Sequence, residues 1–132
     1  MKVFLGGTVN GSVWRDLFIP MLKIDYFNPV VDDWDEAAYQ RELFERENCD
    51  YCLYVITPKA EGFYSIAELV DDSNKRPEKT LFIPLNNDGN QWFSEHQVKS
   101  LKKIIAMVKK NGAKVFSNME EAASFLNQEV NV

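Results

Sequence analysis

The feature that most constrains the fold is the apolar run Tyr51–Ile56, which reads Tyr-Cys-Leu-Tyr-Val-Ile with no polar alternation. A run of this kind is typical of a central strand covered on both faces, as in the parallel sheets of α/β proteins. The chain has 132 residues and is 45% hydrophobic, which is enough to fill the core of one domain. We therefore treat residues 1–132 as a single domain built around this strand.

Short apolar runs and amphipathic stretches alternate along the rest of the chain. We expect strands at 2–5, 26–28, 51–56, 80–84 and 114–116, and helices at 12–23, 35–48, 64–73, 93–110 and 118–127. Pro20 lies inside the first helix and predicts a kink or an early end there. Hydrophobic spacing places Leu17, Phe44 and Val98 on the inward faces of their helices. Strands that alternate with helices predict a parallel, doubly wound sheet with helices on both faces.

Charge and hydropathy exclude some partners. The formal net charge is -5, so an acidic surface of this kind does not favour nucleic acid. Lysines at helical spacing are expected to form the solvated face of one helix; these are Lys99, Lys102, Lys103, Lys109 and Lys110. No apolar run approaches the ~20 residues of a membrane span. The apolar stretch at Met1–Leu5 is too short for a signal peptide core, so we expect a cytoplasmic protein that does not bind membranes.

The residues that could bind a metal or react as thiols are few. Cys49 and Cys52 form a C-x-x-C pair at the end of a helical pattern, whereas a redox pair needs its first sulfur at a helix N-terminus. The sequence has one histidine, His96, and no second cysteine pair to complete a zinc site. We expect reduced structural thiols, with a redox or metal role as the alternative. No cofactor and no metal are expected.

Ligands of doubly wound sheets bind beyond the carboxyl ends of the strands. The segment after the first strand, Gly6-Gly7-Thr8, lets backbone N–H groups approach a ligand, but it is equally compatible with a tight turn. It lacks the G-x-G-x-x-G and G-x-x-x-x-G-K-[ST] patterns of dinucleotide and triphosphate sites.

The later strand ends carry acids and an aromatic residue. Trp34 offers a surface for stacking and Asp33 offers hydrogen bonds, although an acid there could simply cap the next helix. Glu61 and Glu68 follow the central strand. No G-x-S-x-G is present, so a serine nucleophile is not supported and carboxylate chemistry remains. A lone glutamate at this place is ordinarily a solvated helix residue.

Four fragments together resemble the nucleoside 2-deoxyribosyltransferase superfamily, in particular its short bacterial and phage branch. They are Val3-Phe4-Leu5-Gly6-Gly7-Thr8 followed by Trp14-Arg15 and Pro20; Asn28-Pro29 leading to Asp33-Trp34-Asp35; Glu42, eight residues before Asp50; and Gly62-Phe63-Tyr64-Ser65-Ile66-Ala67-Glu68-Leu69. Each fragment is short, but their order and spacing match over about residues 2 to 85. The resemblance implies a flavodoxin-like (Rossmann-like) five-stranded parallel sheet.

The resemblance also implies an activity and a set of site residues. Glu68 would attack C1′ of a nucleoside as the nucleophile, and Glu42 would handle the proton of the leaving base. The expected substrate contacts are Asp33 and Trp34 to the base, and Gly6, Gly7 and Thr8 to the sugar. The partner would be a nucleoside or nucleotide, and family members are usually homo-oligomers. Asp50 lies at the wrong end of a strand for catalysis and is expected to be structural.

Two departures leave alternatives open. Val70 stands where the family often has glycine, and Gly62 stands where many transferases have an aspartate six residues before the nucleophile. Glu61 is adjacent and could take its place. Hydrolysis, a different nucleotide N-glycoside or a non-catalytic nucleotide-binding domain therefore remain as alternatives. A receiver domain is disfavoured, because the third strand ends in Ile56-Thr57 rather than in an acid.

Overall fold

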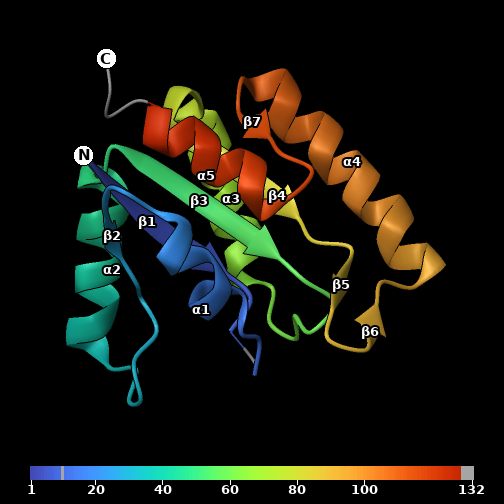
Figure 1. The fold of residues 1–132 in the computed structure, drawn as a ribbon, viewed down its shortest axis with the longest axis horizontal. Coiled ribbons are helices and arrows are strands. Elements are labelled where there is room, and N and C mark those ends of the chain that lie inside the picture. The colour runs from blue at the N-terminus through green and yellow to red at the C-terminus, as the bar shows by residue number, and fades with distance from the viewer. Residues whose placement is uncertain (10, 129–132) are drawn as a thin grey trace.

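The computed structural model describes residues 1–9 and 11–128, and in them five strands form one all-parallel sheet. The strand order is β2-β1-β3-β4-β7, which is the flavodoxin-like arrangement that the family resemblance implies. The strands are β1 (Lys2–Gly7), β2 (Asp25–Phe27), β3 (Tyr51–Ile56), β4 (Thr80–Pro84) and β7 (Lys114–Val115). The chain leaves β1 for β2 on one side and then crosses to β3 on the other, so the order reverses next to β1 (Figure 1).

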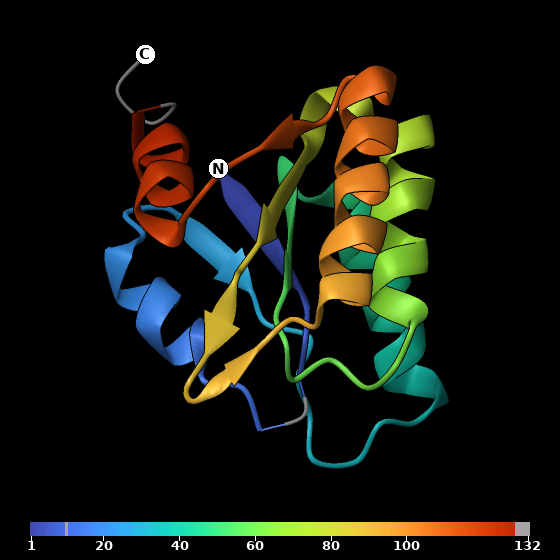
Figure 2. The same ribbon diagram turned by 90° about the vertical axis from the view of Figure 1, so that its right-hand side faces the viewer.

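Helices cover both faces of the sheet. They are α1 (Trp14–Phe18), α2 (Glu36–Asn48), α3 (Tyr64–Lys75), α4 (Glu95–Asn111) and α5 (Met119–Gln128), with short 3-10 turns η1 (Ile19–Met21) and η2 (Pro77–Lys79). Figure 2 shows α1 and α5 on one face and α2, α3 and α4 on the other. The loops that follow β1, β2 and β3 gather at one edge, where the carboxyl ends of the strands lie.

The central strand β3 contributes to a hydrophobic core on each face. Leu53 and Val55 pack with Trp14, Phe18 and residues of α5. The alternate residues of β3 pack with residues of α3 and α4; they are Cys52, Tyr54 and Ile56. Side chains of a strand alternate between its faces, so an apolar residue at every position is what two covered faces require.

Local signals in the sequence set several helix ends. The first helix ends at Phe18 and continues as the 3-10 turn that contains Pro20, as predicted. Helix α2 begins after Asp35, whose carboxylate accepts a hydrogen bond from the backbone N–H of Ala38. Helix α4 ends at Gly112, which has the left-handed backbone (φ 112°) that glycine adopts readily.

Some predictions of local structure were wrong. Leu17 and Phe44 are 57% and 59% exposed, although their spacing predicts inward faces, and Val98 is also exposed. In α2 the inward face is occupied instead by Glu45 and Arg46, which are buried in ion pairs. An antiparallel ribbon of β5 (Asn87–Asp88) and β6 (Gln91–Trp92) was not predicted, since strands of two residues are too short to show a period of two.

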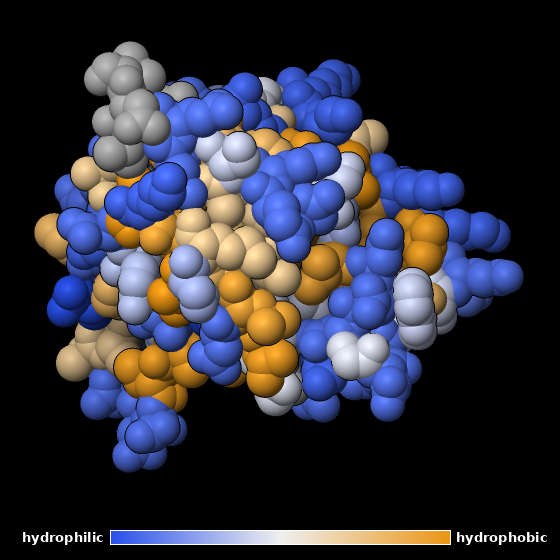
Figure 3. Space-filling model, viewed as in Figure 1, coloured by the Kyte–Doolittle hydropathy of each residue, from blue (hydrophilic) through white to orange (hydrophobic). Residues whose placement is uncertain are grey.

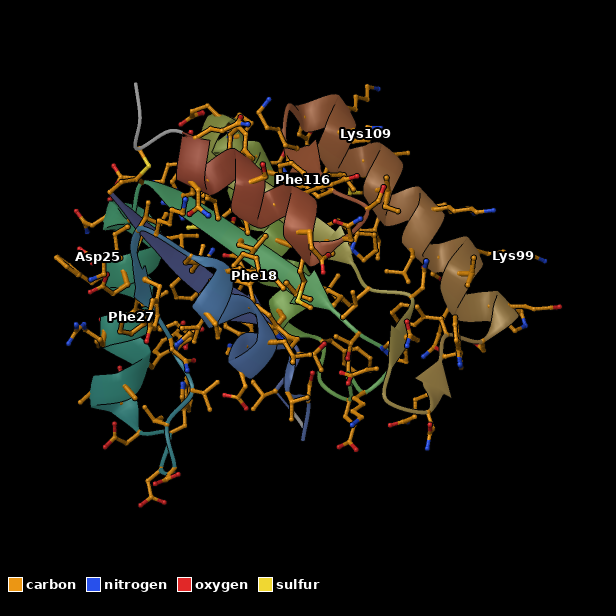
Figure 4. All side chains as sticks on the ribbon, viewed as in Figure 1. Phe18, Asp25, Phe27, Lys99, Lys109 and Phe116 are labelled. Atoms are coloured by element: carbon orange, nitrogen blue, oxygen red, sulfur yellow. The ribbon has the colours of Figure 1, made fainter. Side chains whose placement is uncertain are left out.

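The surface follows the charge pattern of the sequence. The predicted lysine face of α4 is exposed, and Lys99 and Lys109 point away from the helix (Figure 4). Figure 3 shows mostly hydrophilic side chains over α4, at the right of the view, whereas apolar side chains gather over α1. Within the described part of the chain, no helix has the length and apolar character needed to cross a membrane.

Candidate active site

A cavity of about 300 Å³ lies at the carboxyl end of β1, the strand next to which the strand order reverses, and the segment that follows β2 borders it. Ligands of open α/β sheets bind at this place. The loop after β1, the loop before α2, and the helices α1, α2 and α3 all contribute to its wall. The lining residues are Gly6, Gly7, Val9, Arg15, Pro29, Val30, Val31, Trp34, Glu42, Tyr64, Ser65 and Glu68.

Glycine is required where β1 enters this wall. Gly7 has φ 121°, and a Cβ at this residue would lie 2.0 Å from the carbonyl oxygen of Val55 on β3. The carbonyl oxygen of Gly7 accepts a hydrogen bond from Ser65 Oγ at 3.2 Å, which ties the first loop to the start of α3. Only glycine therefore fits at this position, where the backbone lies against β3 and also lines the cavity.

Arg15 stabilises the conformation of the first loop. Its guanidinium donates hydrogen bonds to the carbonyl oxygens of Leu5, Gly7 and Thr8 and stacks over the ring of Trp14 at 4.4 Å. Burial lowers the pKa of Arg15 to about 10, while the nearby Glu42 and Glu68 act in the opposite direction. The residue remains a cation at neutral pH and faces the two acids of the cavity.

Glu68 lies in α3 and is 4% exposed. Its Oε2 atom is fully buried and finds no hydrogen-bond partner among the described residues, although Arg46 Nε lies 3.5 Å away. Burial raises the pKa of Glu68 to about 8, and the charge and hydrogen bond of Glu42 raise it as well. A carboxyl group with these surroundings keeps a proton at neutral pH in the absence of ligand.

Glu42 is the partner of Glu68 across the gap between α2 and α3. A hydrogen bond with Glu42 contributes to the raised pKa of Glu68, so the proton that Glu68 keeps in the free protein can link the two side chains. Glu42 Oε2 also accepts a hydrogen bond from the indole Nε1 of Trp34 at 3.3 Å. The site thus holds two carboxyl groups that share a proton beside a cavity, an arrangement suited to acid–base and nucleophilic chemistry.

Aromatic side chains border the acids. Trp34 is 58% exposed and packs edge-on against Tyr39, with ring centroids 5.3 Å apart. Tyr64 also lines the cavity; its hydrogen bond with Tyr39 and then partial burial raise its pKa to about 12. These rings offer flat, partly exposed faces of the kind on which a planar heterocycle can stack.

Behind Glu68 lies a buried network of charges. Arg46 donates hydrogen bonds to Asp72 at 3.0 and 3.4 Å, and Asp72 is fully buried. Asp72 also accepts hydrogen bonds from the hydroxyl of Tyr54 and from Arg76. Burial lowers the pKa of Arg46, but Tyr54, Asp72 and Glu68 raise it by more, so Arg46 stays positively charged.

The structure brings five of the seven predicted site residues together around the cavity: Gly6, Gly7, Trp34, Glu42 and Glu68. Thr8 is buried and its hydroxyl accepts a hydrogen bond from the N–H of Thr57, so it lines an adjoining pocket instead. Asp33 is exposed and lies outside the described lining of the cavity. Glu61, the possible substitute for the family aspartate, lines the adjoining pocket and not the Glu68 cavity.

Sequence reasoning assigned no role to Arg46 or Asp72. Both follow a predicted acid by one helical turn, Arg46 after Glu42 and Asp72 after Glu68. Residues four apart share a helix face, so this spacing was the available signal. Asp50, expected to be structural, accepts a hydrogen bond from the N–H of Lys2 at 2.8 Å, far from the carboxyl ends of the strands.

The two cysteines do not line this cavity. Among the described residues, Cys49 and Cys52 are free thiols and both are buried. Burial raises the pKa of Cys49 to about 12 and raises that of Cys52 further, so both are protonated and unreactive at neutral pH. Residues 1–9 and 11–128 contain no cluster of histidine, cysteine, aspartate and glutamate that could hold a metal ion.

Fold and site together define a flavodoxin-like α/β domain with a paired-carboxyl cavity at the carboxyl edge of its sheet. Comparison with protein-family models matches residues 1–83 to the family described as nucleoside 2-deoxyribosyltransferase like. The chain belongs to this family, and the matched segment contains Glu42, Glu68 and the whole lining of the cavity. Searches of curated proteins and of solved structures gave no match.

Proposed function

We propose that the protein cleaves the N-glycosidic bond of a nucleoside and transfers the sugar, through a covalent bond to Glu68, to another base or to water. The observation that carries the proposal is the hydrogen-bonded pair of Glu42 and the buried Glu68 at the wall of the cavity. One proton shared by two carboxyl groups provides the two groups that the reaction needs, one acid and one carboxylate nucleophile.

When substrate binds, the proton that Glu68 holds in the free protein passes to Glu42, so that Glu68 is ionised and Glu42 is the acid in the first half-reaction. The Glu68 carboxylate forms a bond to C1′ while the bond from C1′ to the base nitrogen breaks. The electron pair of the broken bond goes to the base, which takes the proton from Glu42. The products are a glycosyl ester of Glu68, a neutral free base and an ionised Glu42.

In the second half-reaction Glu42 acts as the base. It accepts a proton from the N–H of an acceptor base or from water, whose nitrogen or oxygen then bonds to C1′. The ester bond to Glu68 breaks and its electron pair returns to the carboxylate, which restores the starting pair. Two displacements at C1′ retain the configuration of the sugar carbon.

The lining of the cavity supports a nucleoside as the substrate class. Trp34 and Tyr64 offer aromatic faces for the base, and the backbone at Gly6 and Gly7 lines the part of the cavity that we assign to the sugar. The guanidinium of Arg15 is engaged by the carbonyl oxygens of Leu5 and Thr8, so it is not available to grip a polyphosphate.

The test is incubation of the purified protein with each 2′-deoxynucleoside and ribonucleoside and their 5′-monophosphates, with and without a free acceptor base. Products are separated by chromatography, and the quenched protein is weighed by mass spectrometry. We expect substrate turnover and a glycosyl adduct on the peptide that contains Glu68. Glu68→Gln serves as the inactive variant, and Glu78→Gln, an exposed glutamate at η2, serves as the matched control.

Each outcome has a distinct meaning. A new nucleoside that forms only with an acceptor base identifies a transferase, whereas free base and free sugar identify a hydrolase of the same family. In both cases Glu68→Gln abolishes the reaction and Glu78→Gln leaves it unchanged. Absence of turnover with every substrate, together with binding of nucleosides by calorimetry, would replace the proposal with a non-catalytic binding domain.

A further inference from the structure

The two oxygens of the Glu68 carboxyl group have different surroundings. Oε2 is fully buried, lies 3.5 Å from Arg46 Nε and has no hydrogen-bond partner among the described residues. Glu68 nevertheless lines the cavity and is hydrogen-bonded to Glu42. Since Oε2 is closed off from solvent, the oxygen available to the cavity is Oε1.

Arg46 is held rigidly behind Oε2. Its side chain is 6% exposed, its Nε and Nη2 donate to Asp72, and Nη2 also donates to Asp71 at 3.2 Å. Asp72 is fixed in turn by Tyr54 and Arg76. A planar guanidinium held on two sides has lost most of its rotamer freedom, so it presents a fixed positive charge 3.5 Å from Glu68 Oε2 that attracts this oxygen without a hydrogen bond.

We propose that Arg46 is a positioning residue for Glu68: it holds Oε2 at the back of the cavity, so that Oε1 is the oxygen that bonds to C1′. The inference rests on the proposed function and assigns a role that the family match leaves open. The position of Arg46 on α2, one turn after Glu42, allows one helix to supply both the proton carrier and the group that orients the nucleophile.

The charge of Arg46 acts in both half-reactions. Among the described residues, the charged and titratable groups that face Glu68 are Glu42 and Arg46 from α2, Tyr64 and Asp72 from α3, Arg15 from α1 and Tyr54 from β3. Arg46 favours the ionised form of Glu68, against the effect of Glu42 and Asp72. It therefore stabilises the carboxylate before attack and again when the ester bond breaks.

The experiment compares Arg46→Met, Arg46→Lys and the matched control Arg41→Met. Arg41 lies on the same helix but pairs with Glu45 and contacts Phe27, away from the cavity. The titration midpoint of Glu68 is followed by NMR of glutamate labelled at the side-chain carboxyl carbon, with Glu68→Gln used to assign the signal. Steady-state kinetics with the substrate found above give kcat and KM.

We expect Arg46→Met to raise the titration midpoint of Glu68 by about one pH unit or more, as loss of a close opposite charge does. We expect kcat to fall by roughly 100-fold with KM changed by less than about threefold, because orientation acts on the chemical step. Arg46→Lys keeps the charge and should restore the midpoint but only part of kcat. Arg41→Met should change neither quantity.

Loss of Arg46 leaves Asp72 buried without its cation, so Arg46→Met can fail to fold. For this case Arg46→Met is combined with Asp72→Asn and compared with Asp72→Asn alone. Removal of Arg46 should again raise the midpoint of Glu68 in this pair. An unchanged midpoint in a folded protein without Arg46 would overturn the inference even if the enzyme is active. A raised midpoint in a protein without any turnover would sustain the electrostatic role and refute only the proposed reaction.

Discussion

The indole Nε1 of Trp34 donates a hydrogen bond to Glu42 Oε2 at 3.3 Å, and Glu42 is hydrogen-bonded in turn to Glu68. An exposed aromatic ring is thereby linked to the acid that would protonate a departing base. The ring comes from the loop before α2 and the acid from α2 itself, so one short segment places both groups at the cavity.

Replacement of Trp34 separates stacking from hydrogen bonding. Trp34→Ala should raise KM for the nucleoside by about 5- to 100-fold, because stacking of a base on an aromatic side chain is worth about 1–3 kcal/mol. Trp34→Phe keeps a ring and should recover most of the loss in KM, with a smaller fall in kcat from the missing N–H. Steady-state kinetics check this; equal KM values for Trp34→Ala and the wild type would contradict it.

The shared proton predicts a limit at alkaline pH. As pH rises through about 8, the value to which the pKa of Glu68 is raised, the pair loses its proton and the leaving base loses its proton donor. The value of kcat/KM should therefore fall above about pH 8. A pH profile of kcat/KM measures this directly, and a profile that stays flat from pH 7 to pH 10 would contradict it.

Glu42→Gln should remove this alkaline limit. The pKa of Glu68 falls in the variant because the repelling charge is gone. The value of kcat/KM at neutral pH should fall by roughly 10²–10⁴, the usual contribution of a general acid. A nucleoside whose purine is already cationic through N7-methylation needs no proton to leave, so it should lose far less activity in Glu42→Gln. An equal loss for both substrates would contradict the acid role of Glu42.

Glu68 should make the fold less stable as pH rises. The pKa of Glu68 is about 8 in the folded protein and about 4.5 in an unfolded chain, so the folded state holds the proton more tightly. Below about pH 4.5 the carboxyl group is protonated in both states, and the stability that its neutral form allows is fully present. As the pH rises from about 4.5 to about 8, the free energy of unfolding falls by about 1.4 kcal/mol per pH unit.

The glutamine in Glu68→Gln cannot ionise, so this variant does not lose stability as the pH rises from about 4.5 to about 8. The melting temperature of Glu68→Gln should exceed that of the wild type by a margin that widens between pH 5 and pH 8. Each kcal/mol corresponds to roughly 4 °C for a chain of this size. Thermal unfolding at several pH values provides the measurement, and Glu78→Gln should follow the wild type throughout.

The buried network behind the site should be essential for stability. Asp72→Ala leaves the buried Arg46 without its main partner and should lower the free energy of unfolding by about 3–5 kcal/mol. Asp71→Ala removes a neighbouring acid whose side chain is 42% exposed, and should cost less than about 1 kcal/mol. Denaturant unfolding distinguishes the two, and similar losses would show that burial of the charges is not what matters.

The sequence predicts the sheet well because its signals are local. The run Tyr51–Ile56 corresponds to β3 residue for residue, and Pro20 and Gly112 mark helix ends where they are expected. The burial of α2 was not predictable in the same way. Its inward face carries Glu45 and Arg46, whose partners Lys2 and Asp72 are distant in sequence, so hydrophobic spacing placed Phe44 inward instead.

The candidate site was likewise predictable only where the signals are local in sequence. Topology alone places Glu68 near the crevice, since it follows the central strand, but the choice of this glutamate as nucleophile came from family resemblance. The pairing of Glu42 with Glu68 and of Arg46 with Asp72 depends on how α2 packs beside α3. Spacing within one helix could suggest a charged face but could not show which groups meet across two helices.

The match to the family ends at residue 83, inside β4, yet the sheet does not end there. Leu81 and Phe82 pair with β7, and the remaining helices α4 and α5 each cover one of the two cores. A fragment cut at the end of the match would leave β4 as an unpaired edge with bare apolar faces, a template for pairing with other chains. The residues beyond the match therefore cover the edge at β4 and complete both hydrophobic cores. A chain that ends at residue 83 should aggregate rather than fold into an active domain.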